Sequence, residues 1–87
     1  MKPGFGIIGC GNIGEAIIKG ILTKDIIPKS RIVVNDAVHS KLNYIRQHYG
    51  LKCSDNAELA KKCDIIILAV KPQDLSKVMS GISGSLV

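Results

Sequence analysis

Three glycines near the start of the chain have the spacing of a phosphate-binding loop. Gly9, Gly11 and Gly14 form a G-x-G-x-x-G pattern. In such a loop the first glycine permits a tight turn with positive φ, the second leaves room for a pyrophosphate, and the third lets a helix lie close to a sheet. The N–H groups at the start of that helix would face the phosphates. The pattern therefore predicts dinucleotide binding, with a purely structural glycine turn as the alternative.

The residues around this loop favour the binding interpretation. Phe5, Ile7 and Ile8 precede it as a short buried strand. The stretch after it predicts an amphipathic helix, because small or apolar residues recur on one face, at Ile13, Ala16, Ile17, Gly20 and Ile21. A strand, a glycine turn and a helix are the setting in which this fingerprint binds a dinucleotide.

A second candidate site lies at the end of the next strand, which we expect over residues 31–35. A carboxylate about 20 residues beyond the glycine loop commonly accepts hydrogen bonds from the adenosine ribose and disfavours a 2′-phosphate. Asn35 is neutral and could donate to a phosphate, whereas Asp36, directly after it, could repel one. The pair leans toward NADP and leaves NAD open, because no helper arginine accompanies it. The alternative is that both are turn residues.

The rest of the chain alternates between strand and helix patterns. The run from Ile65 to Val70 is almost wholly apolar and predicts a central parallel strand. This order is the first half of a doubly wound parallel sheet of the Rossmann type, an α/β fold, in a single domain over residues 1–87. The further elements that we expect are a helix over 40–49 that ends at Gly50, an extended piece over 51–53, a short helix from the capping pattern at Asp55 to about Lys62, and a last helix that begins at Gln73 or Asp74 and covers about 75–82.

The length indicates an incomplete fold. A chain of 87 residues is shorter than a complete doubly wound fold and leaves no room for a substrate-binding domain. We therefore expect the N-terminal dinucleotide-binding part of a longer protein, or a module that obtains the rest from a partner.

The composition disfavours several other classes of function. The net charge is +5, but the lysines are scattered and not interleaved with aromatic residues, so solvated surface charge is favoured over nucleic-acid binding. The longest apolar run, over residues 65–70, is too short to cross a membrane, and Met1-Lys2-Pro3 offers no signal peptide, so we expect a cytoplasmic protein.

The three cysteines suggest no metal site. Cys10, Cys53 and Cys63, with His39 and His48, lack the spacing of zinc ligands. Buried or bystander thiols are the favoured interpretation. Because Cys10 lies within the glycine loop, an oxidation-sensitive thiol is the alternative there.

Three stretches together resemble the pyrroline-5-carboxylate reductase family. GIIGCGNIGEAIIKGIL is similar to that family's F-I-G-x-G-N-M-G-x-A-I-x-x-G-L opening, and DNAELAKKCDIIILAVKPQDL is similar to its D-N-x-E-x-x-x-x-A-D-x-x-x-L-A-V-K-P-Q segment. Tyr49-Gly50 falls in register between them. The resemblance implies an NADPH-dependent oxidoreductase of amino-acid biosynthesis, which reduces the C=N bond of the cyclic imine 1-pyrroline-5-carboxylate to give L-proline.

The resemblance also implies roles for single residues. It assigns no catalytic group and no metal ligand within the chain. For Lys71, an ordinary surface lysine in a turn is the alternative to a place beside the cofactor. In many relatives the residues after the second strand include an arginine, and this chain has Asp36-Ala37 there instead. The implied contacts assign the pyrophosphate to Gly9, Gly11, Asn12 and Ile13 (Gly14 completing the loop), the 2′-phosphate to Asn35 beside Asp36, the adenosine ribose to Asn56, and the nicotinamide half to Ala69, Val70, Lys71 and Pro72.

The family's second domain is a helical bundle that forms the dimer and most of the imine site. None of it is present, so we expect this chain to bind a nicotinamide dinucleotide without catalysing the reaction. We also expect it to self-associate as a homo-oligomer, because a half-sheet leaves the strand over residues 65–70 with an open edge. Two other interpretations stay open. One is another NADP-dependent reductase of the same superfamily, of the F420-dependent or β-hydroxyacid type, and the other is a non-catalytic nucleotide-sensing module.

Overall fold

Four parallel strands form the centre of the protein. The computed structural model describes residues 4–82. Met1-Lys2-Pro3, on which the expectation of no signal peptide depends, lie outside the described residues. The elements in chain order are β1 (Phe5–Ile8), α1 (Asn12–Thr23), the 3-10 turn η1 (Lys29–Arg31), β2 (Ile32–Asn35), α2 (His39–Tyr49), β3 (Lys52–Cys53), α3 (Asn56–Lys62), β4 (Ile65–Leu68) and α4 (Pro72–Ile82).

The strand order is β3-β2-β1-β4, with every pair parallel. In register, Phe5 of β1 lies opposite Ile32 of β2 on one side and Ile65 of β4 on the other. The prediction of a parallel α/β half-sheet is therefore confirmed. Order β3-β2-β1 followed by a switch to β4 is the topology expected of the first half of a doubly wound fold.

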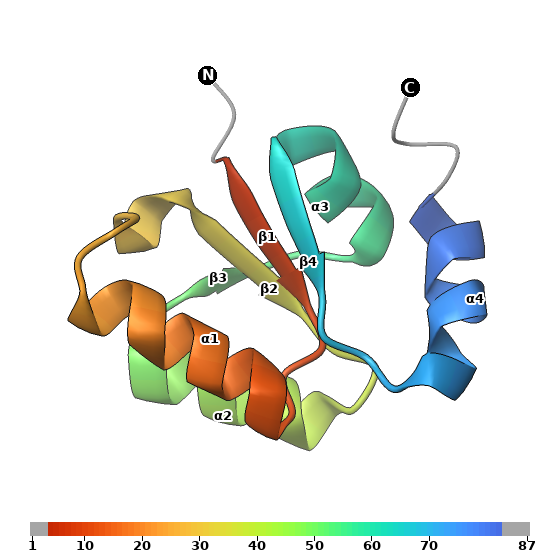
Figure 1. Ribbon diagram of the computed structural model, residues 1–87, viewed down its shortest axis with the longest axis horizontal. Helices are drawn as coiled ribbons and strands as arrows, with labels where there is room; N and C mark the ends of the chain where they lie inside the picture. Colours follow the sequence, from red (N-terminus) through yellow and green to blue (C-terminus); the bar gives the residue numbers. More distant parts are fainter. Residues whose placement is uncertain (1–3, 83–87) are drawn as a thin grey trace.

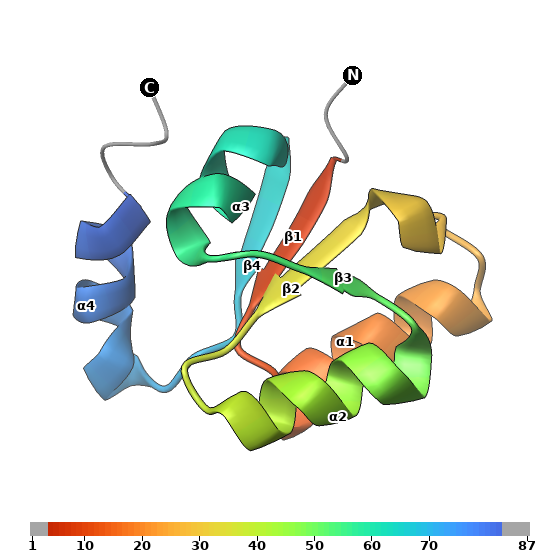
Figure 2. The ribbon, with the colours of Figure 1, turned by 180° about the vertical axis from the view of Figure 1, so that it is seen from behind.

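Helices cover both faces of this sheet (Figures 1 and 2). On one face Ile18 and Ile21 of α1 and Ile45 of α2 pack on Ile7 and Val34. The other face has its own cluster, formed by Ile8, Val33, Leu59, Ala60, Cys63 and Ile82, in which α3 and α4 take part. Burial on both faces explains why the strands are rich in isoleucine and valine and not alternately polar.

The strand predicted over residues 65–70 is shorter than predicted, and it has the open edge expected of a half-sheet. The strand stops at Leu68, and it lies at the edge of the described sheet, where Ile65 is 57% exposed. Within residues 4–82, β4 pairs with β1 alone. A further strand beyond β4 would give this apolar run the burial that its composition suggests.

The predicted buried face of α1 needs correction. Gly14, Ile18 and Ile21 are buried, whereas Ile13 is 70% exposed and Ala16 also faces solvent. Gly20 is exposed as well, and Ile17 is half-buried. Gly14 packs against the backbone of the glycine loop, and this contact rotates the helix so that positions four and seven residues later face the sheet.

The remaining helix ends follow local chemistry. Gly50 ends α2 in the left-handed conformation, with φ 68°, and its N–H donates to the Arg46 carbonyl. The Asp55 side chain caps α3 by accepting from the Glu58 N–H at 2.8 Å. The last helix begins earlier than predicted, because Pro72 occupies its first position, where a proline needs no N–H partner. Among the described helices, none is long and apolar enough to span a bilayer.

Candidate functional site

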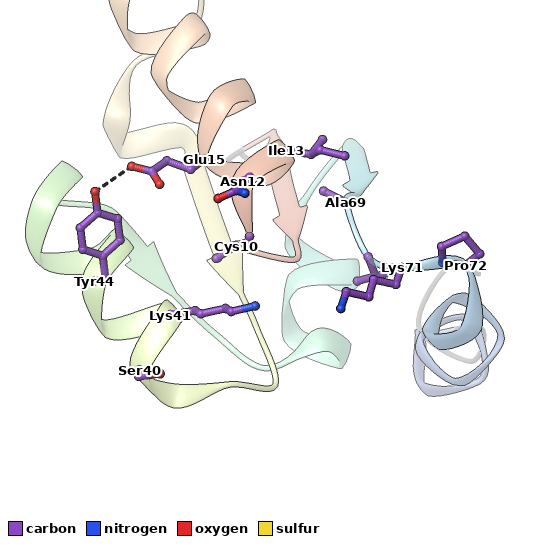
Figure 3. A pocket seen from close by; sticks show the side chains of 12 residues that line it. Cys10, Asn12, Ile13, Glu15, Ser40, Lys41, Tyr44, Ala69, Lys71 and Pro72 are labelled. Carbon is purple, nitrogen blue, oxygen red and sulfur yellow. Dashed lines mark hydrogen bonds between the residues drawn. The ribbon is translucent and has the colours of Figure 1, made fainter.

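A pocket of about 780 Å³ lies where β1 and β4 end and their connections diverge to opposite faces of the sheet. This divergence is the point at which open parallel sheets bind ligands. Figure 3 shows the side chains around it, from the glycine loop, α2 and the β4–α4 corner. The lining residues are Cys10, Gly11, Asn12, Ile13, Glu15, Ser40, Lys41, Tyr44, Ala69, Val70, Lys71 and Pro72.

The three glycines of the loop meet different surroundings. Gly9 has φ 109°, and a Cβ there would collide with the Ala69 carbonyl oxygen. A Cβ on Gly14 would collide with the carbonyl oxygen of Gly9. A Cβ on Gly11 would meet nothing within 4 Å, because this residue faces the open pocket. Two glycines therefore allow the loop to fold, and the third leaves a space that a ligand can fill.

Asp36 ties the glycine loop to the end of β2. Its Oδ2 accepts from the Cys10 N–H at 2.6 Å, and its Oδ1 accepts from the Val38 N–H at 2.7 Å. The Gly9 N–H also donates to the Asn35 carbonyl at 2.8 Å. Both carboxylate oxygens thus have backbone partners, which is the turn chemistry that the sequence left open as an alternative.

Two residues expected around the adenosine half contact each other. The Asn35 Nδ2 donates to Oδ1 of Asn56 at 2.6 Å, which joins the end of β2 to the start of α3. The expected site residues that do not line the pocket are Gly9, Gly14, Asn35, Asp36 and Asn56. The other expected site residues line it: Gly11, Asn12, Ile13, Ala69, Val70, Lys71 and Pro72.

Cys10 is a buried thiol with a weak tendency to ionise. Burial, with the negative charge of Asp36, raises its pKa to about 11, and its Sγ lies 3.6 Å from the Asn35 carbonyl. Since the thiolate is the reactive form, this environment disfavours the oxidation-sensitive role considered for Cys10. Cys10, Cys53 and Cys63 are free thiols, and residues 4–82 hold no cluster of three side chains suited to a metal ion.

Residues 4–87 of the chain match the protein family described as NADP oxidoreductase, coenzyme F420-dependent. The chain belongs to this family.

The curated proteins that this chain resembles include pyrroline-5-carboxylate reductases. The enzyme of *Methanosarcina acetivorans* is 35% identical over 94% of the chain and 31% of its own length. The *Escherichia coli* enzyme is 36% identical over 99% of the chain and 32% of its own length. The chain thus spans about a third of the length of these relatives, and the resemblance seen in the sequence is confirmed.

Solved structures lead to the same group of proteins. A pyrroline-5-carboxylate reductase from *Coxiella burnetii* superposes with a TM-score of 0.81 at 28% identity, over 88% of the chain and 28% of that protein. A *Plasmodium falciparum* pyrroline carboxylate reductase with NADP bound gives a TM-score of 0.80 at 32% identity, over 95% of the chain and 29% of that protein. The arrangement of strands and helices in this family member is therefore that of pyrroline-5-carboxylate reductases.

The sequence did not predict one wall of this pocket, which side chains of α1 and α2 form. Ser40, Lys41 and Tyr44 reach it from α2, and Glu15 reaches it from α1. No local pattern predicts them, because they meet the glycine loop only through the packing of α2 beside α1. For Ser40 and Lys41, the one available signal was their position shortly after the strand that ends at Asn35.

Glu15 joins the two helices. Its Oε2 accepts hydrogen bonds from the hydroxyls of Tyr49 and Tyr44, each at 2.8 Å. Both bonds lower the pKa of Glu15, and the bond from Tyr49 contributes most. Removal from water and the bond to Glu15 raise the pKa of Tyr49 to about 12. The His48 ring, at the surface, stacks on Tyr44 with centroids 5.2 Å apart. We call the two hydrogen bonds from Tyr44 and Tyr49 to Glu15 the clasp, and they fix the acidic side chain that lines the pocket.

Proposed function

We propose that this chain is the NADPH-binding domain of a pyrroline-5-carboxylate reductase. In the whole enzyme, hydride would pass from the nicotinamide to the C=N carbon of 1-pyrroline-5-carboxylate, giving L-proline. The observation that carries the proposal is the 36% identity to the *E. coli* enzyme over 99% of the chain. The NADP recorded in the *P. falciparum* structure supports NADP as the cofactor.

The pocket fits a dinucleotide by shape and by charge. The space beside Gly11 would admit a pyrophosphate close to the backbone at the start of α1. Within the described chain, the Lys41 and Lys71 side chains supply the positive charge on the pocket wall, and Glu15 is its acidic residue. The cofactor would supply the hydride, and the chain would supply position.

The two ends of the cofactor would take opposite sides of the loop. β2 lies on one side of β1 and β4 on the other. We assign the adenosine half to the β2 side, near Asn35 and Asn56, and the nicotinamide half to the β4 side, near Ala69 and Lys71. The β4–α4 corner would flank the ring, while the imine site and the catalytic groups would belong to another domain.

A second candidate substrate comes from the family description. Because that description names coenzyme F420, hydride exchange between NADP and F420 is the alternative reaction. The two are separated by assaying the full-length enzyme for NADPH oxidation with 1-pyrroline-5-carboxylate and, separately, with F420. We expect turnover with the imine only, and turnover with F420 alone would overturn the substrate assignment.

The first experiment is a titration of the chain with NADPH and NADH at one salt concentration, followed by nicotinamide fluorescence. We expect tighter binding of NADPH and no imine reduction by the chain alone. Binding of neither nucleotide would contradict the proposal. A preference for NADH would support the alternative that Asp36 accepts from the ribose.

We also propose that the protein is homo-oligomeric and cytoplasmic. The outer edge of β4, unpaired within residues 4–82, offers backbone groups to a second copy, and Ile65 there is exposed. Three free thiols fit a reducing compartment. Sedimentation of the chain at increasing concentration should show association that Ile65→Lys weakens, and a persistent monomer would contradict the first part.

A further inference from the structure

We propose that Lys41, assisted by the Ser40 hydroxyl, recognises the 2′-phosphate that distinguishes NADP from NAD. This inference rests on the proposed function and names the residue that sets its cofactor preference. It replaces the expectation that Asn35 alone meets this phosphate.

The residues at the end of β2 are already occupied. The Asn35 amide donates to Asn56, and both oxygens of Asp36 accept from backbone N–H groups. Neither residue lines the pocket. An uncharged amide that already donates to Asn56, next to a carboxylate, is a poor receptor for a group that carries close to two negative charges. A cation must come from elsewhere if this chain prefers NADP.

Lys41 is the cation on the correct side of the pocket. It lies in the first turn of α2, directly after β2, and its side chain lines the pocket together with Gly11 and Asn12. Figure 3 shows the side chain extending from α2 across the opening between Ser40 and the glycine loop. The other lining lysine, Lys71, projects from the β4–α4 corner, on the side assigned to nicotinamide.

The Lys41 ammonium is available for a ligand. Within residues 4–82, Lys41 forms no ion pair with a carboxylate, whereas Lys62 of α3 pairs with Glu58. The acidic residue that shares its wall, Glu15, is held by Tyr44 and Tyr49. Ser40, the residue before Lys41, adds a hydroxyl donor to the same wall of the pocket. An ammonium and a hydroxyl on adjacent residues are suitable donors for a phosphate dianion.

The test compares Lys41→Met with Lys24→Met, which removes the same charge from the end of α1, away from the pocket. Dissociation constants for NADPH and NADH are measured by nicotinamide fluorescence at one salt concentration. We expect Lys41→Met to weaken NADPH binding by about 10- to 100-fold, the effect of losing a charge-assisted hydrogen bond. NADH binding should change less than about twofold, since it lacks the phosphate.

Two further variants sharpen the result. Lys41→Arg keeps the charge and should keep most of the preference for NADPH, and Ser40→Ala should weaken NADPH binding by about threefold. Unchanged NADPH affinity in Lys41→Met, or equal losses for both nucleotides, overturns the role of Lys41 while the proposed function stands. A wild-type chain that binds neither nucleotide overturns both.

Discussion

The glycine loop and the start of α2 face each other across one pocket, and they are built in opposite ways. The loop offers backbone and empty space, with Gly9 and Gly14 pressed against neighbouring carbonyl groups and Gly11 open to the pocket. The start of α2 offers side chains, an exposed lysine and a serine hydroxyl, on a wall whose acid is clasped by two tyrosines. Shape on one wall suits the pyrophosphate common to both cofactors, and charge on the other suits the phosphate that only NADP has.

The largest effect should come from filling the space behind the loop. In Gly14→Ala the new methyl group collides with the Gly9 carbonyl, which cannot move without breaking the turn. We expect a loss of about 3 kcal/mol in the free energy of unfolding. Gly20→Ala, in the same helix with nothing within 4 Å, should gain about 0.5–1 kcal/mol. Urea denaturation of both variants checks the pair, and equal stabilities would refute the packing argument.

Gly11→Ala should separate binding from folding. The new methyl group meets no protein atom within 4 Å, so the midpoint of urea unfolding should move little. It projects into the pocket, where it should weaken NADPH and NADH alike by about tenfold or more. The same titration that tests Lys41→Met measures this. A selective loss of NADPH would show that the two walls do not divide recognition as proposed.

Asp36→Asn tests the bond between the two walls. An amide has one oxygen where the carboxylate has two, so either the Cys10 N–H or the Val38 N–H loses its acceptor. We expect a loss of about 1–2 kcal/mol in stability. The pKa of Cys10 should fall, because Asp36 contributes to raising it. Denaturation and the pH dependence of thiol modification measure the two effects, and unchanged values of both would remove Asp36 from this structural role.

The smallest effect concerns the clasp on the α2 wall. Tyr49 keeps its proton in the folded protein up to a pH of about 12, whereas an unperturbed tyrosine loses it near 10. Its contribution to stability is therefore present below pH 10 and is lost as the pH rises toward 12. Tyr49→Phe and Glu15→Gln should both flatten the decline in unfolding free energy over this range. An unaltered slope in both variants would mean that the clasp is not formed in solution.

The sequence predicted one wall of the pocket far better than the other. Gly9 and Gly14 are constrained by backbone stereochemistry, which their residue type reveals, and the parallel sheet follows from its runs of isoleucine and valine. The buried face of α1 was predicted incorrectly because apolar residues surround much of that helix, and the contact at Gly14 decides between them. The place of β4 depends on whether a strand lies beyond it, and no property of the run over 65–70 contains that information.

The wall formed by α2 could not be predicted from the sequence, because none of its residues is distinctive when taken alone. Lys41 is one lysine among many, and Glu15, Tyr44 and Tyr49 acquire their relation only when two helices separated by β2 pack side by side. Asp36 was visible as a candidate, but the sequence could not show that both its oxygens have backbone partners. A group of side chains that comes from several helices and strands can be identified only once the fold is known.

The clasp has an optical consequence. The chain has no tryptophan, and its two tyrosines both donate to Glu15 beside the pocket. Near-ultraviolet emission of this chain therefore arises at a single place, and a hydrogen bond to a carboxylate quenches tyrosine emission. A reduced nicotinamide absorbs in the range where tyrosine emits, so a bound cofactor would dim that emission by energy transfer. The chain carries its own spectroscopic probe for the arrival of a ligand, without any label.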